Sequence, residues 1–241
     1  MSSFTGYRGG KGDYLTMNNH QFAVKDLTKF YNGRKVLDIP YLTIKKGIIC
    51  GVIGSNGSGK TTLLSILSLL IKPTSGRVYF DGLEIDSRDN DNSTLRRQIT
   101  MVLQNPFLLN STVEKNVAYG LSIRGLSKRE QKQKVVECLD LVGLAGFEKR
   151  RARELSGGEA QRVAIARGIA VTPKVLFLDE PTANVDKTKI DILENIIKEL
   201  NHRHKTTIIF TTHDLNQPYR VVDEVIILSE GKIKEILTPD S

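Results

Sequence analysis

A run of small and polar residues separates two apolar segments of the chain. The stretch GSNGSGKTT, residues 54–62, follows the apolar run IICGVI and precedes LLSILSLLI. The apolar flanks predict a buried strand before the stretch and a buried helix after it. A strand, a glycine-rich loop and a helix in this order can bind phosphate, because loop N–H groups curl towards the anion and the helix N-terminus adds its dipole. The chain is therefore expected to bind a phosphorylated ligand.

The loop also fits the pattern G-x-x-x-x-G-K-[ST], in which the lysine reaches the outer phosphates and the hydroxyl residue binds Mg²⁺. Lys60 and Thr61 occupy these two positions. An ordinary glycine-rich turn is the alternative, and the strand and helix around the loop favour phosphate binding over it. The predicted phosphate-binding residues are Gly54, Ser55, Asn56, Gly57, Ser58, Gly59, Lys60, Thr61 and Thr62.

The bulk composition is that of a globular protein. The chain has 241 residues, of which 39% are hydrophobic and 26% charged, and this suits one large domain or one domain with an inserted subdomain. Cys50 and Cys138 give no disulfide framework and are expected to be reduced thiols. The net charge of +8 is compatible with a solvated surface, a membrane face or nucleic acid.

The apolar runs do not predict a membrane anchor. The best candidate, residues 63–71, is shorter than the ~18 apolar residues that a membrane-spanning helix needs. Residues 1–19 contain several glycines, no apolar periodicity and no apolar core of a signal peptide. They are expected to form a disordered N-terminal tail.

Apolar alternation and turn residues predict the order of strands and helices. Strands are expected at 21–30, 37–44, 48–53, 77–80, 83–85, 100–103, 175–178 and 206–211, with a hairpin at 225–237. Helices are expected from the glycine loop to about Ile71, at 157–170 and at 187–201, and residues 110–153 are expected to form a helical insert. Strands that alternate with helices predict an α/β fold with a parallel sheet covered on both faces.

Two carboxylates follow one of the predicted buried strands. The segment VLFLDE ends in Asp179 and Glu180. Ligands of open α/β sheets bind at the carboxyl ends of the strands. Asp179 is therefore placed to hold a metal, directly or through water, and Glu180 to polarise a water molecule. A polar turn is the alternative, and the glycine loop in the same chain favours the functional interpretation.

The segment LSGGE opens another predicted helix. Ser156 and Glu159 have the spacing of a capping box, which needs no ligand. A cap does not require Gly157 and Gly158, however, and each glycine costs about 1 kcal/mol in a helix relative to alanine. Bare backbone N–H groups in that turn predict a second anion site.

Two other polar residues follow predicted strands. Gln104 comes directly after TMVL, and His213 follows TTIIFTT. Each is more often an ordinary surface residue, which is also what we expect of His20, His202 and His204. Their positions at carboxyl ends of strands make Gln104 and His213 candidates only in combination with the other motifs.

The ordered set GSNGSGKT, Gln104, LSGGE, VLFLDE and His213 resembles the ATP-binding subunits of ABC transporters. The resemblance covers residues 20–241, and LSGGE between the two other motifs is its most specific part. It implies a P-loop NTPase fold: a RecA-like parallel sheet core, an N-terminal antiparallel β subdomain and a helical subdomain inserted at about 106–156. It also implies an ATPase with ATP and Mg²⁺ as its ligands.

In that family, two subunits dimerise head to tail and hold each ATP between the glycine loop of one and the LSGG-type signature of the other. By resemblance, Glu180 is the general base, His213 contacts the γ-phosphate and Lys60 binds phosphate. The implied Mg²⁺ ligands are Thr61, Gln104 and Asp179. Ser156, Gly157, Gly158, Glu159 and Asp186 would contact the nucleotide or the loop of the partner subunit.

The resemblance includes an aromatic position and departs from the family pattern at two others. Tyr31 matches the aromatic residue that stacks on adenine, with Phe30 as its rival and a core tyrosine as the alternative. Glu159 stands where glutamine is the commonest residue of the signature. The segment ANVD (183–186) replaces the commoner Ser-Ala-Leu-Asp, and Asp186 is the position that keeps its match.

The implied partners are transmembrane permease subunits, a second ATPase subunit and an extracytoplasmic solute-binding protein, with the chain at the cytoplasmic face of the membrane and no nucleic acid bound. The segment STVEKNVAYGLSIRG (111–125) resembles T-V-x-E-N-V-A-[FY]-G-L of importer subunits, with Lys115 inserted. The signature region resembles importers of tungstate or molybdate. The alternative is a soluble ATPase of this family that acts on a cytosolic scaffold, as in iron–sulfur cluster assembly.

Overall fold

The strands form two sheets, and their arrangement places the glycine loop at one edge of the larger one. The computed structural model describes residues 19–85, 92–183, 190–214 and 220–239. The smaller, antiparallel sheet has the order β2-β1-β4-β5 and comprises β1 (His20–Tyr31), β2 (Arg34–Lys45), β4 (Ser75–Phe80) and β5 (Leu83–Glu84).

The larger sheet has the order β10-β9-β3-β8-β7-β6. Its strands are β3 (Ile49–Ile53), β6 (Ile99–Val102), β7 (Val175–Leu178), β8 (Thr207–Thr212), β9 (Glu224–Ser229) and β10 (Lys232–Leu237). All neighbouring pairs are parallel except β10 with β9. The loops after β3, β7 and β8 therefore emerge at the same edge.

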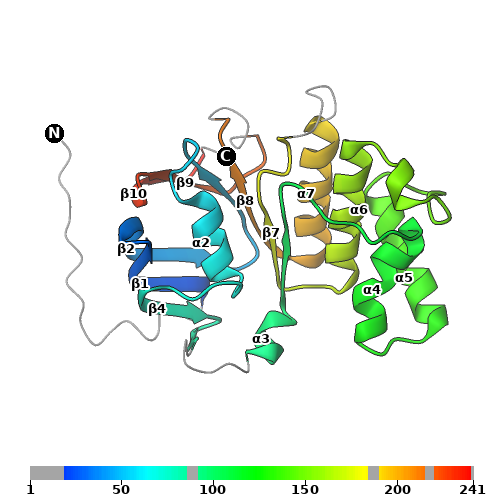
Figure 1. Cartoon of the computed structure of the whole chain (residues 1–241), viewed down its shortest axis with the longest axis horizontal. Coiled ribbons are helices and arrows are strands. Elements are labelled where there is room, and N and C mark those ends of the chain that lie inside the picture. The colour runs from blue at the N-terminus through cyan, green and yellow to red at the C-terminus, as the bar shows by residue number, and fades with distance from the viewer. Residues whose placement is uncertain (1–18, 86–91, 184–189, 215–219, 240–241) are drawn as a thin grey trace.

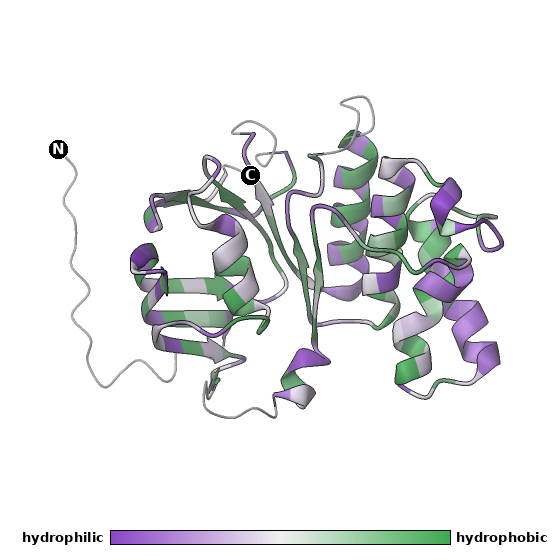
Figure 2. Ribbon diagram, in the orientation of Figure 1, coloured by the Kyte–Doolittle hydropathy of each residue, from purple (hydrophilic) through white to green (hydrophobic). Residues whose placement is uncertain are grey.

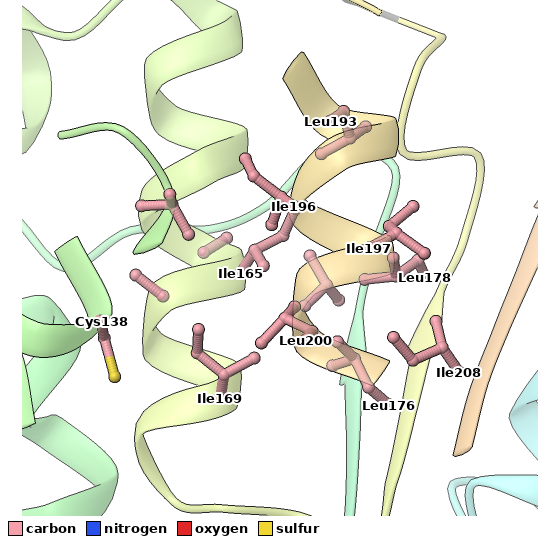
Figure 3. Close-up of a cluster of buried hydrophobic side chains, with 14 of the residues drawn as sticks. Cys138, Ile165, Ile169, Leu176, Leu178, Leu193, Ile196, Ile197, Leu200 and Ile208 are labelled. Carbon is pink, nitrogen blue, oxygen red and sulfur yellow. The ribbon is translucent and has the colours of Figure 1, made fainter. Parts of the chain in front are cut away.

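The central strands of this sheet are covered on both faces, and every residue of β3, β7 and β8 is buried. In β7, Val175 and Phe177 pack into the cluster that contains helix α2 (Lys60–Leu67) and the antiparallel sheet. Leu176 and Leu178 point the other way, into the cluster of α6 (Gly157–Ala170) and α7 (Ile190–His204). Figure 1 shows α2 and α6 on opposite sides of β7 and β8, and Figure 3 shows the side chains of α6 and α7 against the sheet.

The predicted helical insert contains two helices. α4 (Val113–Ile123) and α5 (Lys128–Leu141) follow β6 in the chain and pack against α6 at the far end of the molecule (Figure 1). Ser127 and Glu130 form a capping box at the start of α5. The outer surface of α5 is hydrophilic, as Figure 2 shows. The subdomain limits of about 106–156 stay a prediction, and residues 1–18 lie outside the described part.

Several predicted element limits are wrong. The helix after the glycine loop ends at Leu67 rather than near Ile71, because Leu69 has a left-handed φ of 63° and the Leu70 amide turns back to the Ser65 carbonyl. Two short elements were not predicted, α3 (Ser93–Arg96) and the 3₁₀ helix η2 (Ala152–Glu154). α7 extends to His204, and the predicted start at 187 lies outside the described residues. In the described ranges, every helix is too short or too polar to span a membrane.

The turn between β9 and β10 connects three elements around the glycine loop. The Gly231 amide donates to the carbonyl of Ser58 at 2.9 Å, and its carbonyl accepts from the Asp38 amide of β2 at 2.8 Å. Gly231 has a φ of +74°, and a Cβ added there would overlap the carbonyl oxygen of Val36. Gly33, in the β1–β2 turn, has a φ of +79° but open space around it.

These two glycines separate backbone strain from steric overlap. Gly33→Ala should lower the free energy of unfolding by about 1–2 kcal/mol, since only the left-handed backbone is strained. Gly231→Ala should lower it by about 1–3 kcal/mol more, because the added methyl displaces β2. Urea denaturation of both variants measures the difference. Equal losses would show that the contact of Gly231 with β2 does not constrain this turn.

Candidate nucleotide-binding site

The glycine loop lies between β3 and α2, as its sequence predicts. The side chain of Lys60 folds back across the loop and is buried. Its ammonium donates to the carbonyl oxygens of Gly54 at 2.8 Å and Ser55 at 3.2 Å. The Ser58 hydroxyl is buried, with no hydrogen-bond partner in the described part of the chain. A buried cation beside an unpaired hydroxyl suits an anionic group.

Asp179 joins the loop helix to the parallel sheet. Its carboxylate is 5% exposed, and the same oxygen, Oδ1, accepts from the Thr61 hydroxyl at 3.1 Å and the Thr211 hydroxyl at 2.7 Å. Thr61 belongs to α2, Asp179 follows β7 and Thr211 lies in β8. The structure thus brings the predicted pair Thr61 and Asp179 together and adds Thr211.

Glu180 lies between two of the other predicted residues. Its Oε1 is 3.3 Å from the Lys60 ammonium, and its Oε2 is 3.1 Å from Nδ1 of His213. The Glu180 amide donates to the Thr211 hydroxyl at 2.8 Å. Its φ of 43° is left-handed, which costs a non-glycine residue about 1–3 kcal/mol. The backbone is therefore held in a strained conformation that aims the carboxylate at the loop.

The residues around Asp179 fit a magnesium ion. Mg²⁺ prefers oxygen ligands and is commonly held by one or two protein groups together with phosphates and water. The Thr61 hydroxyl and the Asp179 carboxylate lie 3.1 Å apart and supply such oxygens. Gln104 is half-buried and follows β6, the strand beside β7, at the same edge of the sheet.

The predicted adenine contact is less well defined. Tyr31 ends β1 and is 46% exposed, and Phe30 next to it is 39% exposed, so exposure does not distinguish the rivals. The Lys29 ammonium lies 5.1 Å from the centre of the Tyr31 ring. A hollow beside the glycine loop is lined by Arg34, Lys35, Val36, Ser55, Asn56, Gly57, Ser58 and Glu230.

The LSGGE segment forms the capping box that its spacing predicts. The Ser156 amide donates to Oε2 of Glu159 at 2.7 Å, and the Glu159 amide donates to the Ser156 hydroxyl at 3.4 Å. Hydrogen bonds from the Ser156 backbone and side chain hold the pKa of Glu159 below its usual value. The capping box does not use the amides of Gly157 and Gly158. These amides also lack a partner inside the helix, because the first N–H groups of a helix have none. A Cβ added at Gly158 would meet nothing within 4 Å.

The two glycine-rich sites belong to different faces of the sheet. α2 packs on one face and α6 on the other, so β7 and β8 lie between them (Figure 1). The helices that follow the glycine loop and the Ser156 turn are thus separated by the sheet. Asp186 lies outside the described residues.

Comparison with known proteins decides the family. The sequence profile described as "ABC transporter" matches residues 37–183. The chain belongs to the ABC transporter family. This ABC chain is 41% identical to the tungstate uptake system ATP-binding protein TupC of Peptoclostridium acidaminophilum, over 89% of this chain and 97% of that protein. It is 40% identical to the Fe(3+) ions import ATP-binding protein FbpC 1 of Haemophilus influenzae, over 91% of this chain and 66% of that protein.

Solved structures of ABC proteins have the same fold. The cbiO1 protein of Clostridium perfringens, part of the cbiONQ transporter complex, superposes with a TM-score of 0.86 at 31% identity, over 92% of this chain and 89% of that one. The dimeric bacterial ABC transporter cassette MJ0796 superposes with a TM-score of 0.84 at 32% identity, over 91% and 99%. The predicted family and the predicted P-loop α/β fold are confirmed, and the ABC chain is an ATPase.

Thr211 is the site residue that the sequence did not single out. It lies within the apolar run TTIIFTT and reads as an ordinary strand residue. Its hydroxyl donates to Asp179 and accepts from the Glu180 amide, so it fixes both acidic residues at once. The available signal was its place at the carboxyl end of a strand. Arg34 and Lys35, which line the hollow beside the loop, were also missed.

Removal of the Thr211 hydroxyl should impair both stability and turnover. Thr211→Val leaves the Glu180 amide without its acceptor, and an unpaired buried group costs about 1–3 kcal/mol. We expect ATP hydrolysis to fall at least tenfold, since the Glu180 carboxylate loses its fixed position. Thr211→Ser keeps the hydroxyl and should retain most activity. Steady-state ATPase assays and urea denaturation of both variants test this, and an active, stable Thr211→Val enzyme would contradict it.

Proposed function

We propose that this ABC ATPase hydrolyses ATP to power the import of a small oxyanion such as tungstate through separate membrane subunits. The observation that carries the proposal is the 41% identity to a tungstate uptake ATP-binding protein over 97% of its length. The relatives named for Fe(3+) import support a role in import in general, rather than the import of one particular cargo. Relatives of this kind do not favour the alternative of a cytosolic scaffold ATPase.

In this proposal, the ATP phosphates bind the amides of residues 54–62 and draw the Lys60 ammonium towards them. Lys60 then leaves the carbonyl oxygens of Gly54 and Ser55, and its contact with Glu180 is weakened. The freed Glu180 carboxylate accepts a proton from the attacking water. His213, whose Nδ1 is 3.1 Å from Oε2 of Glu180, would contact the γ-phosphate.

Mg²⁺, held by Thr61, Gln104 and Asp179, would supply the charge that stabilises the transferring phosphoryl group. Thr211 keeps Asp179 oriented by its 2.7 Å hydrogen bond. Tyr31 or Phe30 would stack on the adenine. Positioning and charge stabilisation then account for most of the catalysis, as is general for phosphoryl transfer.

The ATPase would work as a head-to-tail dimer that binds two ATP molecules. Each ATP would contact the glycine loop of one subunit and Ser156, Gly157, Gly158 and Glu159 of the partner, with Asp186 at the same interface. The position of the two glycine-rich sites on opposite faces of the sheet supports this arrangement. The open space around Gly158 supports the approach of another molecule to that turn.

Glu180→Gln should separate binding from hydrolysis. This variant should bind ATP and form a stable dimer, while turnover falls by roughly 10²- to 10⁴-fold, which is the usual contribution of a general base. Lys60→Ala should fail at an earlier step, nucleotide binding. Size-exclusion chromatography with light scattering and ATPase assays test both. Normal turnover by Glu180→Gln would exclude it as the base, and unchanged ATP affinity of Lys60→Ala would exclude the glycine loop as the phosphate site.

An apolar groove is the proposed docking surface for the permease subunits. It is lined by Met101, Val102, Leu103, Pro106, Phe107, Leu109, Tyr119 and Arg167, between the end of β6 and helix α4. Phe107 is 76% exposed, and Leu103 and Tyr119 are about half exposed. Exposed apolar side chains that gather in one hollow are typical of protein interaction sites. The chain would thus lie at the cytoplasmic face of the membrane, and a solute-binding protein would deliver the cargo to the permease.

A pull-down from detergent-solubilised native membranes tests the transport function. A polytopic membrane protein should remain bound to the tagged wild-type chain after a salt wash. Phe107→Asp should abolish this co-purification and leave ATP binding by the isolated chain intact. Leu83→Asp, which changes a side chain that is 67% exposed on the antiparallel sheet, should have no effect. Capture of soluble partners alone would exclude the transport function but not the ATPase.

A further inference from the structure

The signature turn carries a negative charge at the place where a phosphate is proposed to bind. Oε2 of Glu159 accepts from the Ser156 amide, and its hydrogen bonds to Ser156 keep the pKa of the carboxyl low. Glu159 is therefore ionised at neutral pH, on the first turn of α6. A glutamine could accept the same hydrogen bond without the charge. An anionic phosphate that approaches Gly157 and Gly158 would be repelled unless a cation offsets Glu159.

Within the described part of the chain, Arg150 supplies the ion pair to the other carboxylate oxygen. Its Nη1 lies 3.8 Å from Oε1 of Glu159, with the two side chains 52% and 24% exposed. An exposed ion pair of this kind contributes little to folding. It would be stronger in a dimer interface, because removal of water raises the attraction between charges.

The position of Arg150 is fixed by its surroundings. The guanidinium carbon lies 3.6 Å from the centre of the Phe147 ring, close enough for a cation–π contact. The Arg150 amide donates to the Phe147 carbonyl at 2.9 Å, and its own carbonyl accepts from the Val113 amide at 2.9 Å. The backbone and the side chain are thus both held beside the signature turn.

Two other basic residues near the signature turn, Arg162 and Arg153, form no ion pair with Glu159 among the described residues. Arg162, one turn along α6, also acts on Glu159 through its charge, though less than Arg150, and it donates to the carbonyl oxygens of Val142 and Gly143 at 3.1 Å each. Arg153 is exposed, and the structure gives it no ion pair among the described residues. Among the described residues, Arg150 is therefore the one that forms an ion pair with Glu159 and is also held in place by its neighbours.

We propose that Arg150 is a positioning residue of the signature site, which offsets the Glu159 carboxylate so that the turn can accept the phosphates of the partner's ATP. This inference rests on the proposed head-to-tail dimer and deepens it. It predicts that the effect of replacing Arg150 on ATP-dependent dimerisation depends on the charge of residue 159. A residue with a merely structural role would be needed equally with glutamate or glutamine there.

The test measures the ATP concentration for half-maximal dimerisation of the full chain in the Glu180→Gln background, by light scattering. Arg150→Ala and Arg150→Gln should raise this concentration by about tenfold, a coupling of the size found between contacting charged residues. When Glu159→Gln is also present, the same changes should raise it less than about threefold. Arg150→Lys keeps a cation and should restore most of the affinity.

Arg153→Ala is the matched control, since it removes one positive charge from the same basic segment. It should change the half-maximal ATP concentration by less than about twofold, as expected for a screened surface charge. Equal effects of Arg150→Ala with and without Glu159→Gln, or an equal effect of Arg153→Ala, would overturn the inference. If the Glu180→Gln parent forms no ATP-dependent dimer, the proposed function fails. If the parent dimerises and the Arg150 variants match it, this inference alone fails.

Discussion

The hydrogen bonds to a single carboxylate oxygen hold the candidate site together. Oδ1 of Asp179 accepts from Thr61 of α2 and from Thr211 of β8, so one buried acid joins the phosphate loop helix to two neighbouring strands. Burial of a carboxylate costs folding free energy unless its oxygens accept hydrogen bonds. Here the donors are two hydroxyl groups of the candidate site itself. Through Thr211, the same contact also fixes the Glu180 amide. The relative positions of Asp179, Glu180 and Thr211 thus depend on the pairing of β7 with β8.

The parallel sheet imposes a second constraint, because it has two buried faces. In both β7 and β8, alternate side chains point into opposite apolar clusters. Helix α2 therefore packs on one face of the sheet and α6 on the other. The glycine loop and the signature turn start these two helices, so they begin on opposite faces of the sheet. Two proposed phosphate sites that start on opposite faces suit a symmetric dimer better than a monomer, since each site would then meet the complementary one of a second copy.

Most of the fold was predictable, because its signals are local. The apolar run before GSNGSGKTT, the carboxylates after VLFL and the Ser156–Glu159 spacing each lie within a few residues. The role of Thr211 was not predictable, because it depends on the register between β7 and β8, which are far apart in the chain. The end of α2 was missed because the run LLSILSLLI (63–71) stays mostly apolar up to Ile71, and nothing in that pattern marks the turn at Leu69. The identity of the adenine contact stayed open because Tyr31 and Phe30 are both exposed.

The LSGGE turn shows that a structural and a functional explanation need not exclude each other. The capping box satisfies the amides of Ser156 and Glu159, which are the residue before the helix and the third residue within it. It cannot reach Gly157 and Gly158, whose amides also start the helix without internal partners. Glycine at these positions is unfavourable for the helix and, at Gly158, is not required by any neighbouring atom of the chain. The cap therefore stabilises the turn and leaves the amides of Gly157 and Gly158 for an outside acceptor, as the proposed contact with another subunit's phosphate requires.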